Sequence, residues 1–151
     1  MHMQQTILVT GGAGYIGSAC VQALKTAGHH VVVFDDLTTG KREKVPDGIG
    51  LVVGDLTDEA ALESLFSQHE FDAVIHCAAK KAVGESEERP EYYFKNNVAG
   101  TLNLLTAMAT HAVPKIIFSS TAAVYAPAIS VTAFTEASPI GPVSVYGQSK
   151  L

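Results

Sequence analysis

A glycine-rich turn near the N-terminus limits what this chain can fold into more than any other stretch. The segment 6–17, TILVTGGAGYIG, joins an apolar run to three glycines spaced three apart. We interpret it as a buried strand, a tight turn and a helix start: Gly11 permits the turn, Gly14 a close approach to a diphosphate, and Gly17 helix–strand packing. The helix N-terminus would offer free N–H groups to phosphates. The G-x-x-G-x-x-G spacing differs from the more usual G-x-G-x-x-G, and a glycine turn without a ligand is the alternative.

Strand-like and helix-like patterns alternate along the chain, which predicts βαβ units and a parallel sheet covered on both faces. Right-handed crossovers then predict a Rossmann-type doubly wound α/β sheet with strand order 3-2-1-4-5. The expected strands are 6–10, 31–34, 51–53, 73–76 and 115–119. The expected helices are 15–27, 60–68 with Thr57 as its N-cap, 90–111 and 143–149, with loops at 77–90 and 126–142. No strand follows the last helix, so we expect 1–151 to be a dinucleotide-binding domain incomplete at its C-terminus, without a substrate domain.

The composition argues against several functional classes. A chain of 151 residues with 47% hydrophobic residues fits one domain with a real core, and no apolar run approaches the roughly 20 residues that span a bilayer. A net charge of −5 gives no electrostatic case for binding nucleic acid or an anionic membrane. The six histidines lack ligand spacing, so no metal site is predicted. Without a secretory signal pattern, Cys20 and Cys77 are interpreted as reduced core thiols of a cytoplasmic protein.

Two carboxylates, Asp35 and Asp36, follow the second predicted strand. In a dinucleotide-binding sheet, a carboxylate at this place accepts hydrogen bonds from the adenosine ribose hydroxyls. Two negative charges there would repel the 2′-phosphate of NADP, so the sequence favours NAD, although Lys41 and Arg42 lie nearby. Asp55 would then lie beside the adenine ring. The alternative is that these aspartates only end strands, because aspartate is common in turns.

The segment YGQSK at 146–150 carries the second chemical pattern. Tyr146 and Lys150, four residues apart, would project from one face of a helix. A phenol titrates near pH 10, and a nearby ammonium together with a nicotinamide cation would favour the phenolate and make it a usable base. Thr121, just past the fifth strand, supplies a hydroxyl that would orient a substrate oxygen. A solvated helix face is the alternative, since this spacing also occurs by chance.

Taken together, seven motifs resemble the extended short-chain dehydrogenase/reductases over essentially the whole chain. They are GGAGYIG, FDDLTTG, GDLTD, HCAAKKAVGES, NNVAGT, FSSTAAVY and SVYGQSK. AVGES at 82–86, followed by YYFKNNVAGT, is typical of the UDP-hexose 4-epimerases within that family. The resemblance implies bound NAD and reversible oxidation at the sugar C4, which interconverts UDP-glucose and UDP-galactose.

The resemblance also implies a role for each matching residue. The catalytic residues would be Thr121, Tyr146 and Lys150. The cofactor-binding residues would be Gly11, Gly14, Tyr15, Ile16, Gly17, Asp35, Asp36, Asp55, Leu56, Cys77, Ala78, Ala79, Lys81, Asn96, Tyr146 and Lys150. Asp36 stands where the family usually has Asn, and His76 is interpreted as a structural residue buried under the cofactor.

Length is the main departure from the family pattern. Family members are considerably longer and hold the UDP group in a C-terminal lobe, so we expect a UDP-sugar substrate for the parent enzyme and little activity from this chain alone. The family pairs as homodimers through two helices, one of which is cut short here, so a dimer is doubtful. Two alternatives stay open: a related epimerase or dehydratase, and a non-catalytic nucleotide-binding fragment. Dehydratases usually place acidic residues after the strand-five Thr, where this chain has Ala122 and Ala123.

Overall fold

The computed structural model describes residues 3–127 and 133–151, so part of the predicted loop, 128–132, lies outside the described residues. The chain divides into two compact units. The first contains residues up to Ala79 and Gly100–Ser119. The second contains Lys80–Ala99 and the described part of Ser120–Leu151. We describe each unit separately.

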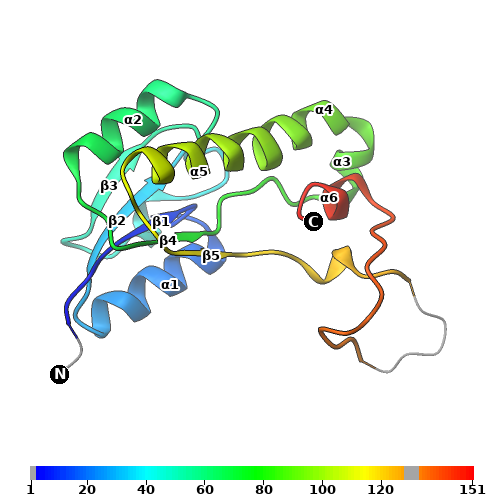
Figure 1. Ribbon diagram of the computed structural model, residues 1–151, viewed down its shortest axis with the longest axis horizontal. Helices are drawn as coiled ribbons and strands as arrows, with labels where there is room; N and C mark the ends of the chain where they lie inside the picture. Colours follow the sequence, from blue (N-terminus) through cyan, green and yellow to red (C-terminus); the bar gives the residue numbers. More distant parts are fainter. Residues whose placement is uncertain (1–2, 128–132) are drawn as a thin grey trace. The chain divides into compact units, whose positions relative to one another are not determined.

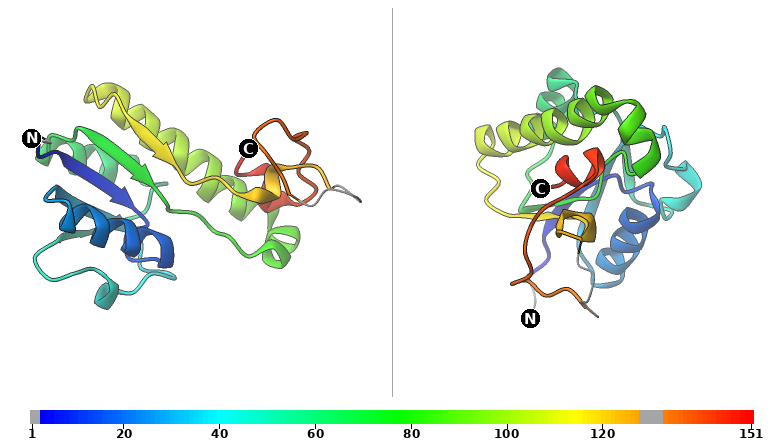
Figure 2. Two further views of the ribbon diagram at one scale, coloured as in Figure 1. Left: turned by 90° about the horizontal axis from the view of Figure 1, so that it is seen from below. Right: turned by 90° about the vertical axis from the view of Figure 1, so that its right-hand side faces the viewer.

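The first unit is built on a five-stranded sheet. Its strands are β1 (Thr6–Thr10), β2 (His30–Asp35), β3 (Gly50–Val53), β4 (Ala73–His76) and β5 (Ile116–Phe118). The strand order is β3-β2-β1-β4-β5, and every pair is parallel. The arrows of β1 (blue), β4 (green) and β5 (yellow) point the same way in Figure 2, left. The predicted Rossmann-type topology is therefore confirmed, with no strand end shifted by more than one residue.

Helices cover both faces of this sheet (Figure 1). Helix α1 (Tyr15–Thr26) lies on one face, and α2 (Glu59–Gln68) and α5 (Gly100–Thr110) lie on the other. Alternate residues of β1 enter different cores, because successive side chains of a strand point to opposite faces. Ile7 and Val9 join the cluster that includes Val21 of α1, whereas Leu8 joins the cluster formed with α2 and α5.

The end signals of these helices are partly those predicted. Gly28 follows α1 with φ of +85°, as expected for a helix C-cap glycine. The predicted N-cap of α2 was wrong by one residue. Asp58, not Thr57, caps the helix and accepts a 3.1 Å hydrogen bond from the Ala61 N–H. Thr57 instead donates its N–H to Asp55 Oδ1 over 2.8 Å, so Asp55 shapes the turn that precedes the cap.

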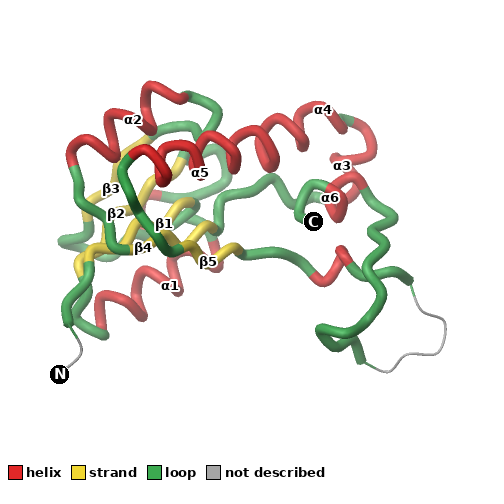
Figure 3. The backbone as a smooth tube through the Cα atoms, in the orientation of Figure 1, coloured by secondary structure: helices red, strands yellow, loops and turns green. Residues whose placement is uncertain are grey.

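The second unit consists of short helical turns and loops (Figure 3). Its elements are α3 (Val83–Glu88), α4 (Pro90–Tyr93), the π-helical segment η2 (Phe94–Ala99), the 3₁₀ turn η3 (Ala122–Val124) and α6 (Val145–Gln148). The prediction of one regular helix over 90–111 was wrong, because η2 interrupts the α-helical hydrogen bonding before α5 begins. The loop predicted at 77–90 contains α3, and α6 is shorter than the helix predicted at 143–149.

Candidate active site

The glycine turn after β1 is held by close backbone packing. Gly11 has a φ of +71°, and a Cβ there would lie 2.6 Å from the Ala78 amide nitrogen. A Cβ at Gly17 would overlap the carbonyl oxygen of Gly11. Gly11 thus has the conformation predicted for the turn, whereas Gly17 packs against the backbone of the turn residues Gly11 and Gly12. Gly12 is a further constrained position that the sequence reasoning missed, because a Cβ there would lie 2.7 Å from a methyl group of Val33.

The N-terminus of α1 fits a bound diphosphate. Gly14 is the N-cap residue, and no side chain caps the helix or places an acid in its first turn. Tyr15 and Ile16, the first two residues of α1, are 80% and 57% exposed. A helix start with uncapped N–H groups and no competing carboxylate favours an anion. A Cβ at Gly14 would lie 3.1 Å from the Gly11 carbonyl oxygen, so a side chain at this position would be crowded by the turn.

Asp35 joins the end of β2 to the glycine turn. Its carboxylate is buried and accepts 2.9 Å hydrogen bonds from the N–H groups of Ala13 and Leu37. Because each carboxylate oxygen can accept more than one hydrogen bond, Asp35 keeps capacity for a hydroxyl ligand such as a ribose. The neighbouring Asp36 accepts from the Thr38 N–H (2.9 Å) and hydroxyl (2.7 Å), so its carboxylate also closes a local turn.

The other cofactor residues predicted in this unit follow β3 and β4. Leu56 is buried in the apolar core beneath Gly100, and Asp55 is exposed. Cys77, Ala78 and Ala79 are half-buried after β4, and no disulfide forms among the described residues. Cys20 is also half-buried, so both cysteines are more exposed than the core positions predicted for them.

His76 lies in the interior of the first unit. Its imidazole is fully buried, with Nδ1 2.6 Å from the Thr10 hydroxyl and Nε2 2.9 Å from the Thr101 hydroxyl. These two contacts join β1, β4 and α5, because His76 ends β4 and Thr101 lies in α5.

The second unit contains the predicted catalytic residues. Tyr146 lies in α6 and is half-buried, whereas Lys150 is 3% exposed. The helix ends at Gln148, and Lys150 follows it in a turn. The Lys150 N–H donates to the Gly147 carbonyl oxygen over 3.2 Å. The prediction that both side chains project from one helix was therefore wrong for Lys150. Thr121 is the N-cap of η3, and its hydroxyl oxygen accepts from the Ala123 N–H over 3.2 Å.

Gly147 brings α6 close to η3. A Cβ on this glycine would lie 2.5 Å from the Ala123 carbonyl oxygen. The contact places the turn that begins at Thr121 against the helix that carries Tyr146, within one unit. The sequence reasoning did not single out Gly147, although its position inside YGQSK was a usable signal.

Two adjacent asparagines in η2 differ in their surroundings. Asn96, the predicted cofactor contact, is half-buried and donates its side-chain amide to the Tyr92 carbonyl over 2.7 Å. Asn97 is 3% exposed, and its side-chain amide bonds to Lys80 and Ser149. Lys81, a predicted cofactor residue, is exposed on the segment before α3. Sequence reasoning missed Asn97, because two consecutive asparagines do not reveal which one faces the interior.

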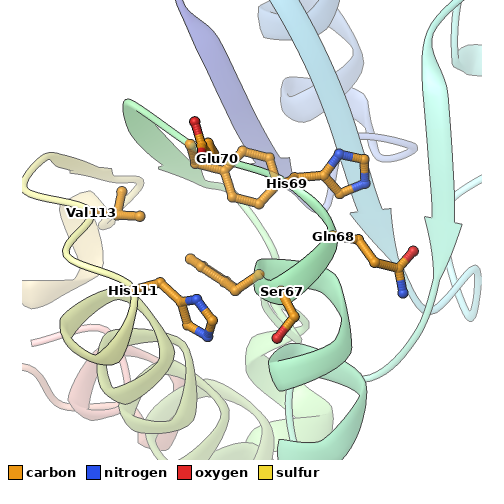
Figure 4. Close-up of a pocket in the computed structure, with 8 residues that line it drawn as sticks. Ser67, Gln68, His69, Glu70, His111 and Val113 are labelled. Atoms are coloured by element: carbon orange, nitrogen blue, oxygen red, sulfur yellow. The ribbon is translucent and has the colours of Figure 1, made fainter.

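A pocket in the first unit lies away from every predicted site residue (Figure 4). It is lined by residues 66–71, His111 and Val113, where α2 ends and β4 has yet to begin. In a parallel sheet, this edge is opposite the carboxyl ends of the strands, where Asp35 and Cys77 stand. Among residues 3–127 and 133–151, no His, Cys, Asp and Glu side chains gather as a metal site, and no helix is long and apolar enough to cross a membrane.

Comparisons with known proteins agree with the fold and motifs. Residues 7–151 match the NAD dependent epimerase/dehydratase family. The UDP-glucose 4-epimerase of Corynebacterium glutamicum is 44% identical over 145 residues, which cover 96% of this chain and 43% of that protein. Its counterpart in Streptomyces lividans is 45% identical over 150 residues, covering 99% of this chain and 45% of the relative.

Solved structures show the same relationship. A crystal structure of a UDP-glucose 4-epimerase superposes with a TM-score of 0.93 at 45% identity, over 96% of this chain and 44% of that one. The UDP-glucose 4-epimerase of Thermus thermophilus, in complex with NAD, also gives 0.93, at 41% identity over 96% and 47% of the two chains. The chain thus spans less than half the length of the relatives it matches. The resemblance to the UDP-hexose 4-epimerases is confirmed, and the chain belongs to the NAD dependent epimerase/dehydratase family.

Proposed function

We propose that this chain carries the NAD-binding and proton-transferring residues of a UDP-glucose 4-epimerase, an isomerase of UDP-hexoses. The observation that carries the proposal is the half-buried Tyr146 on a short, capped helix, followed by the buried Lys150. Relatives 44–45% identical to nearly the whole chain are UDP-glucose 4-epimerases, which favours this reaction over other sugar-nucleotide chemistry.

In this proposal the first unit supplies the adenosine and diphosphate contacts of NAD. The glycine turn and the uncapped start of α1 hold the diphosphate, and Asp35 accepts from the ribose hydroxyls. Asp36 adds a second negative charge, which disfavours the 2′-phosphate of NADP. Asp55 and Leu56 flank the adenine, and residues 77–79 line the cofactor after β4. Bound NAD would supply a reversible acceptor for the hydride of the sugar C4 carbon, so the cofactor would not be consumed.

The second unit supplies the proton chemistry. The phenol oxygen of Tyr146 takes the proton of the sugar 4-hydroxyl and returns it after the sugar has presented its other face. Lys150 places a cation near the phenol and the nicotinamide ribose, which favours the phenolate. The Thr121 oxygen already accepts from the backbone, so its O–H group donates to the substrate oxygen. Lys81 and Asn96 complete the predicted cofactor contacts.

The cofactor part is tested by titrating NAD and NADP into the purified chain by calorimetry. We expect saturable binding of NAD, tighter than NADP. Asp35→Asn keeps the size of the side chain but loses its charge, and we expect it to weaken NAD binding about tenfold. Asp47→Asn is the matched control on an exposed loop. Equal affinity for the two cofactors, or no loss with Asp35→Asn, would contradict the Asp35 assignment.

The reaction part is tested by following conversion of UDP-galactose to UDP-glucose in the presence of NAD, with and without an added C-terminal lobe of a UDP-glucose 4-epimerase, because little activity is expected from this chain alone. We expect Tyr146→Phe to reduce turnover at least about a hundredfold, since general acid–base catalysis contributes this much or more. Tyr92→Phe is the control, because it also removes one phenol while keeping the ring that packs on the Arg89 guanidinium. NAD binding without any turnover, even with the added lobe, would leave a nucleotide-binding module and refute the epimerase proposal for this chain.

A further inference from the structure

Side chains of the second unit hold the start of helix α6, Val145–Gln148. Its first three N–H groups are all bonded to side chains. Val145 donates to Glu87 Oε1 over 2.9 Å, Tyr146 to Ser86 Oγ over 3.1 Å, and Gly147 to the N-cap Ser144 Oγ over 3.0 Å. Two consecutive residues of α3 therefore hold two consecutive amides of α6.

The Ser86 hydroxyl is well fixed for this task. Ser86 is fully buried, and its hydroxyl donates to the Val83 carbonyl over 2.6 Å. Its hydrogen is thereby committed, so the oxygen lone pairs remain to accept from the Tyr146 N–H. Because the Ser86 hydroxyl both donates and accepts a hydrogen bond, its orientation is fixed. This hydroxyl therefore sets the position of the Tyr146 backbone.

A second tyrosine holds α3 itself. The buried Tyr93 hydroxyl lies 2.8 Å from the Ala82 carbonyl oxygen and 2.9 Å from Glu85 Oε2. Burial of this phenol, and then the nearby Glu85 carboxylate, raise the pKa of Tyr93 to about 12. Tyr93 therefore stays a protonated donor at neutral pH. Arg89 adds a 3.2 Å ion pair with Glu85. Residues of the second unit therefore hold α3 in place.

The carbonyl group of Tyr146 is also held by a side chain. It accepts from the Ser149 hydroxyl over 2.8 Å, and that hydroxyl accepts from the Asn97 amide over 2.9 Å. Asn97 in turn bonds both backbone groups of Lys80, over 2.8 and 2.9 Å. Both backbone groups of Tyr146 are thus held by polar side chains of the second unit.

We infer that Ser86, Glu87 and Asn97 are positioning residues for the proton transfer at Tyr146, an inference that rests on the proposed function. None of them acts on the sugar itself. Ser86 and Glu87 hold the start of α6, and Asn97 holds its end through Ser149. Together they restrict the Tyr146 phenol to one location, and small displacements of a catalytic group reduce rate strongly.

The contact is tested first by hydrogen exchange at the Val145 and Tyr146 amides. We expect Glu87→Ala to speed exchange at Val145 about tenfold and Ser86→Ala to do the same at Tyr146. Glu88→Ala removes an equal charge from the neighbouring residue of α3 and should change neither amide. Unchanged exchange in the first two variants, or an equal change with Glu88→Ala, would overturn the inference.

The positioning role is tested by turnover of UDP-galactose in the same variants, each assayed with the added C-terminal lobe. We expect Ser86→Ala and Glu87→Ala to lower kcat about tenfold at unchanged KM and unchanged NAD affinity. Ser86→Thr and Glu87→Gln keep an acceptor oxygen and should restore kcat. Faster exchange with normal kcat, or loss of kcat without rescue by Thr or Gln, would reduce these residues to a structural role and refute the inference. A wild-type chain that stays inactive with the added lobe would refute the proposed function and the positioning role together, while the exchange result would still report whether the contact exists.

Discussion

The two units of this protein hold their functional residues by different physical means. In the first, the glycine turn after β1 is fixed by backbone surfaces in contact, backed by two apolar clusters. In the second, the buried residues are largely polar, among them Ser86, Asn97, Ser149 and Lys150. The first arrangement tolerates no added atom, whereas the second depends on hydrogen-bond partners being present.

This difference changes how each unit responds to substitution. Removing atoms from an apolar cluster lowers the protein's stability roughly in proportion to the atoms removed. Removing the partner of a buried polar group lowers it by the full desolvation penalty of the group that remains. Among the described residues, every buried side-chain nitrogen or oxygen has a hydrogen-bond partner. The second unit therefore depends on a complete set of bonds, in which each member supports the next.

The largest effect should come from adding one methyl group to the glycine turn. Gly17→Ala places a Cβ into the Gly11 carbonyl, which is backbone and cannot rotate away. We expect the free energy of unfolding to fall by about 3 kcal/mol and NAD binding to be lost. Gly50→Ala is the control, because nothing lies within 4 Å of the position that its added methyl group would take. Urea denaturation measures the stability, and calorimetric titration measures the NAD binding. If Gly17→Ala were as stable as Gly50→Ala, close backbone packing would not be what fixes the glycine turn.

Removing one amide from the second unit should have the next largest effect. Asn97→Ala leaves the Lys80 N–H and C=O without their side-chain partner, and we expect protection of amides in the second unit to fall by about 2 kcal/mol. Residue-resolved hydrogen exchange separates the two units. Asn96→Ala, which removes a single bond to Tyr92, should cost about half as much. A loss spread equally over both units would contradict the view that the second unit has its own polar interior.

A smaller effect should separate the predicted from the observed helix cap of α2. Asp58→Ala removes the acceptor of the Ala61 N–H and should lower stability by about 1 kcal/mol. Thr57→Ala tests the residue that the sequence pattern favoured, and we expect a change within about 0.5 kcal/mol. Thermal melting compares the stability of the two variants directly. A larger loss with Thr57→Ala than with Asp58→Ala would support Thr57 as the N-cap.

The smallest effect is a pH-dependent one at the surface of the first unit. The contact with His111 Nε2, 3.1 Å away, and then the Ser67 hydroxyl hold the pKa of Glu63 below its usual value of 4.5. A lowered folded-state pKa gives stability that is present above 4.5 and is lost as the pH falls through the folded-state value.

Glu63→Gln should therefore melt at a slightly lower temperature than the wild type near pH 6, and the difference should disappear near about pH 3. Calorimetry across this range measures it. Glu70→Gln, an exposed carboxylate of the pocket that His111 also lines, is the control. A difference that persists at the acid end would show that the carboxylate charge is not its source.

Local sequence patterns were enough to predict the first unit. Its strands are apolar runs, its turn needs glycine for steric reasons, and its sheet order follows from right-handed crossovers. The errors there were at element ends, as at Asp58, where two adjacent residues can both cap a helix and only the backbone geometry selects one.

The second unit was predicted less well, because its elements are short and held by polar contacts between distant residues. The motifs AVGES and YGQSK marked the right segments, but nothing in them showed that Ser86 bonds the Tyr146 amide or that Asn97 faces inward. The π-helical turn likewise leaves no clear sequence pattern, because it changes hydrogen bonding rather than hydrophobic spacing.

The sequence by itself therefore determined the parallel sheet, the glycine turn with its carboxylate at Asp35, and the kinship with 4-epimerases. Each of these depends on residue types at short spacing, which local sterics and hydrophobic periodicity translate directly into structure. Only the tertiary structure decided that α6 ends before Lys150 and that side chains of α3 and η2 hold it in place. Such bonds join residues up to 60 positions apart, and their partners are selected by packing rather than by any local pattern.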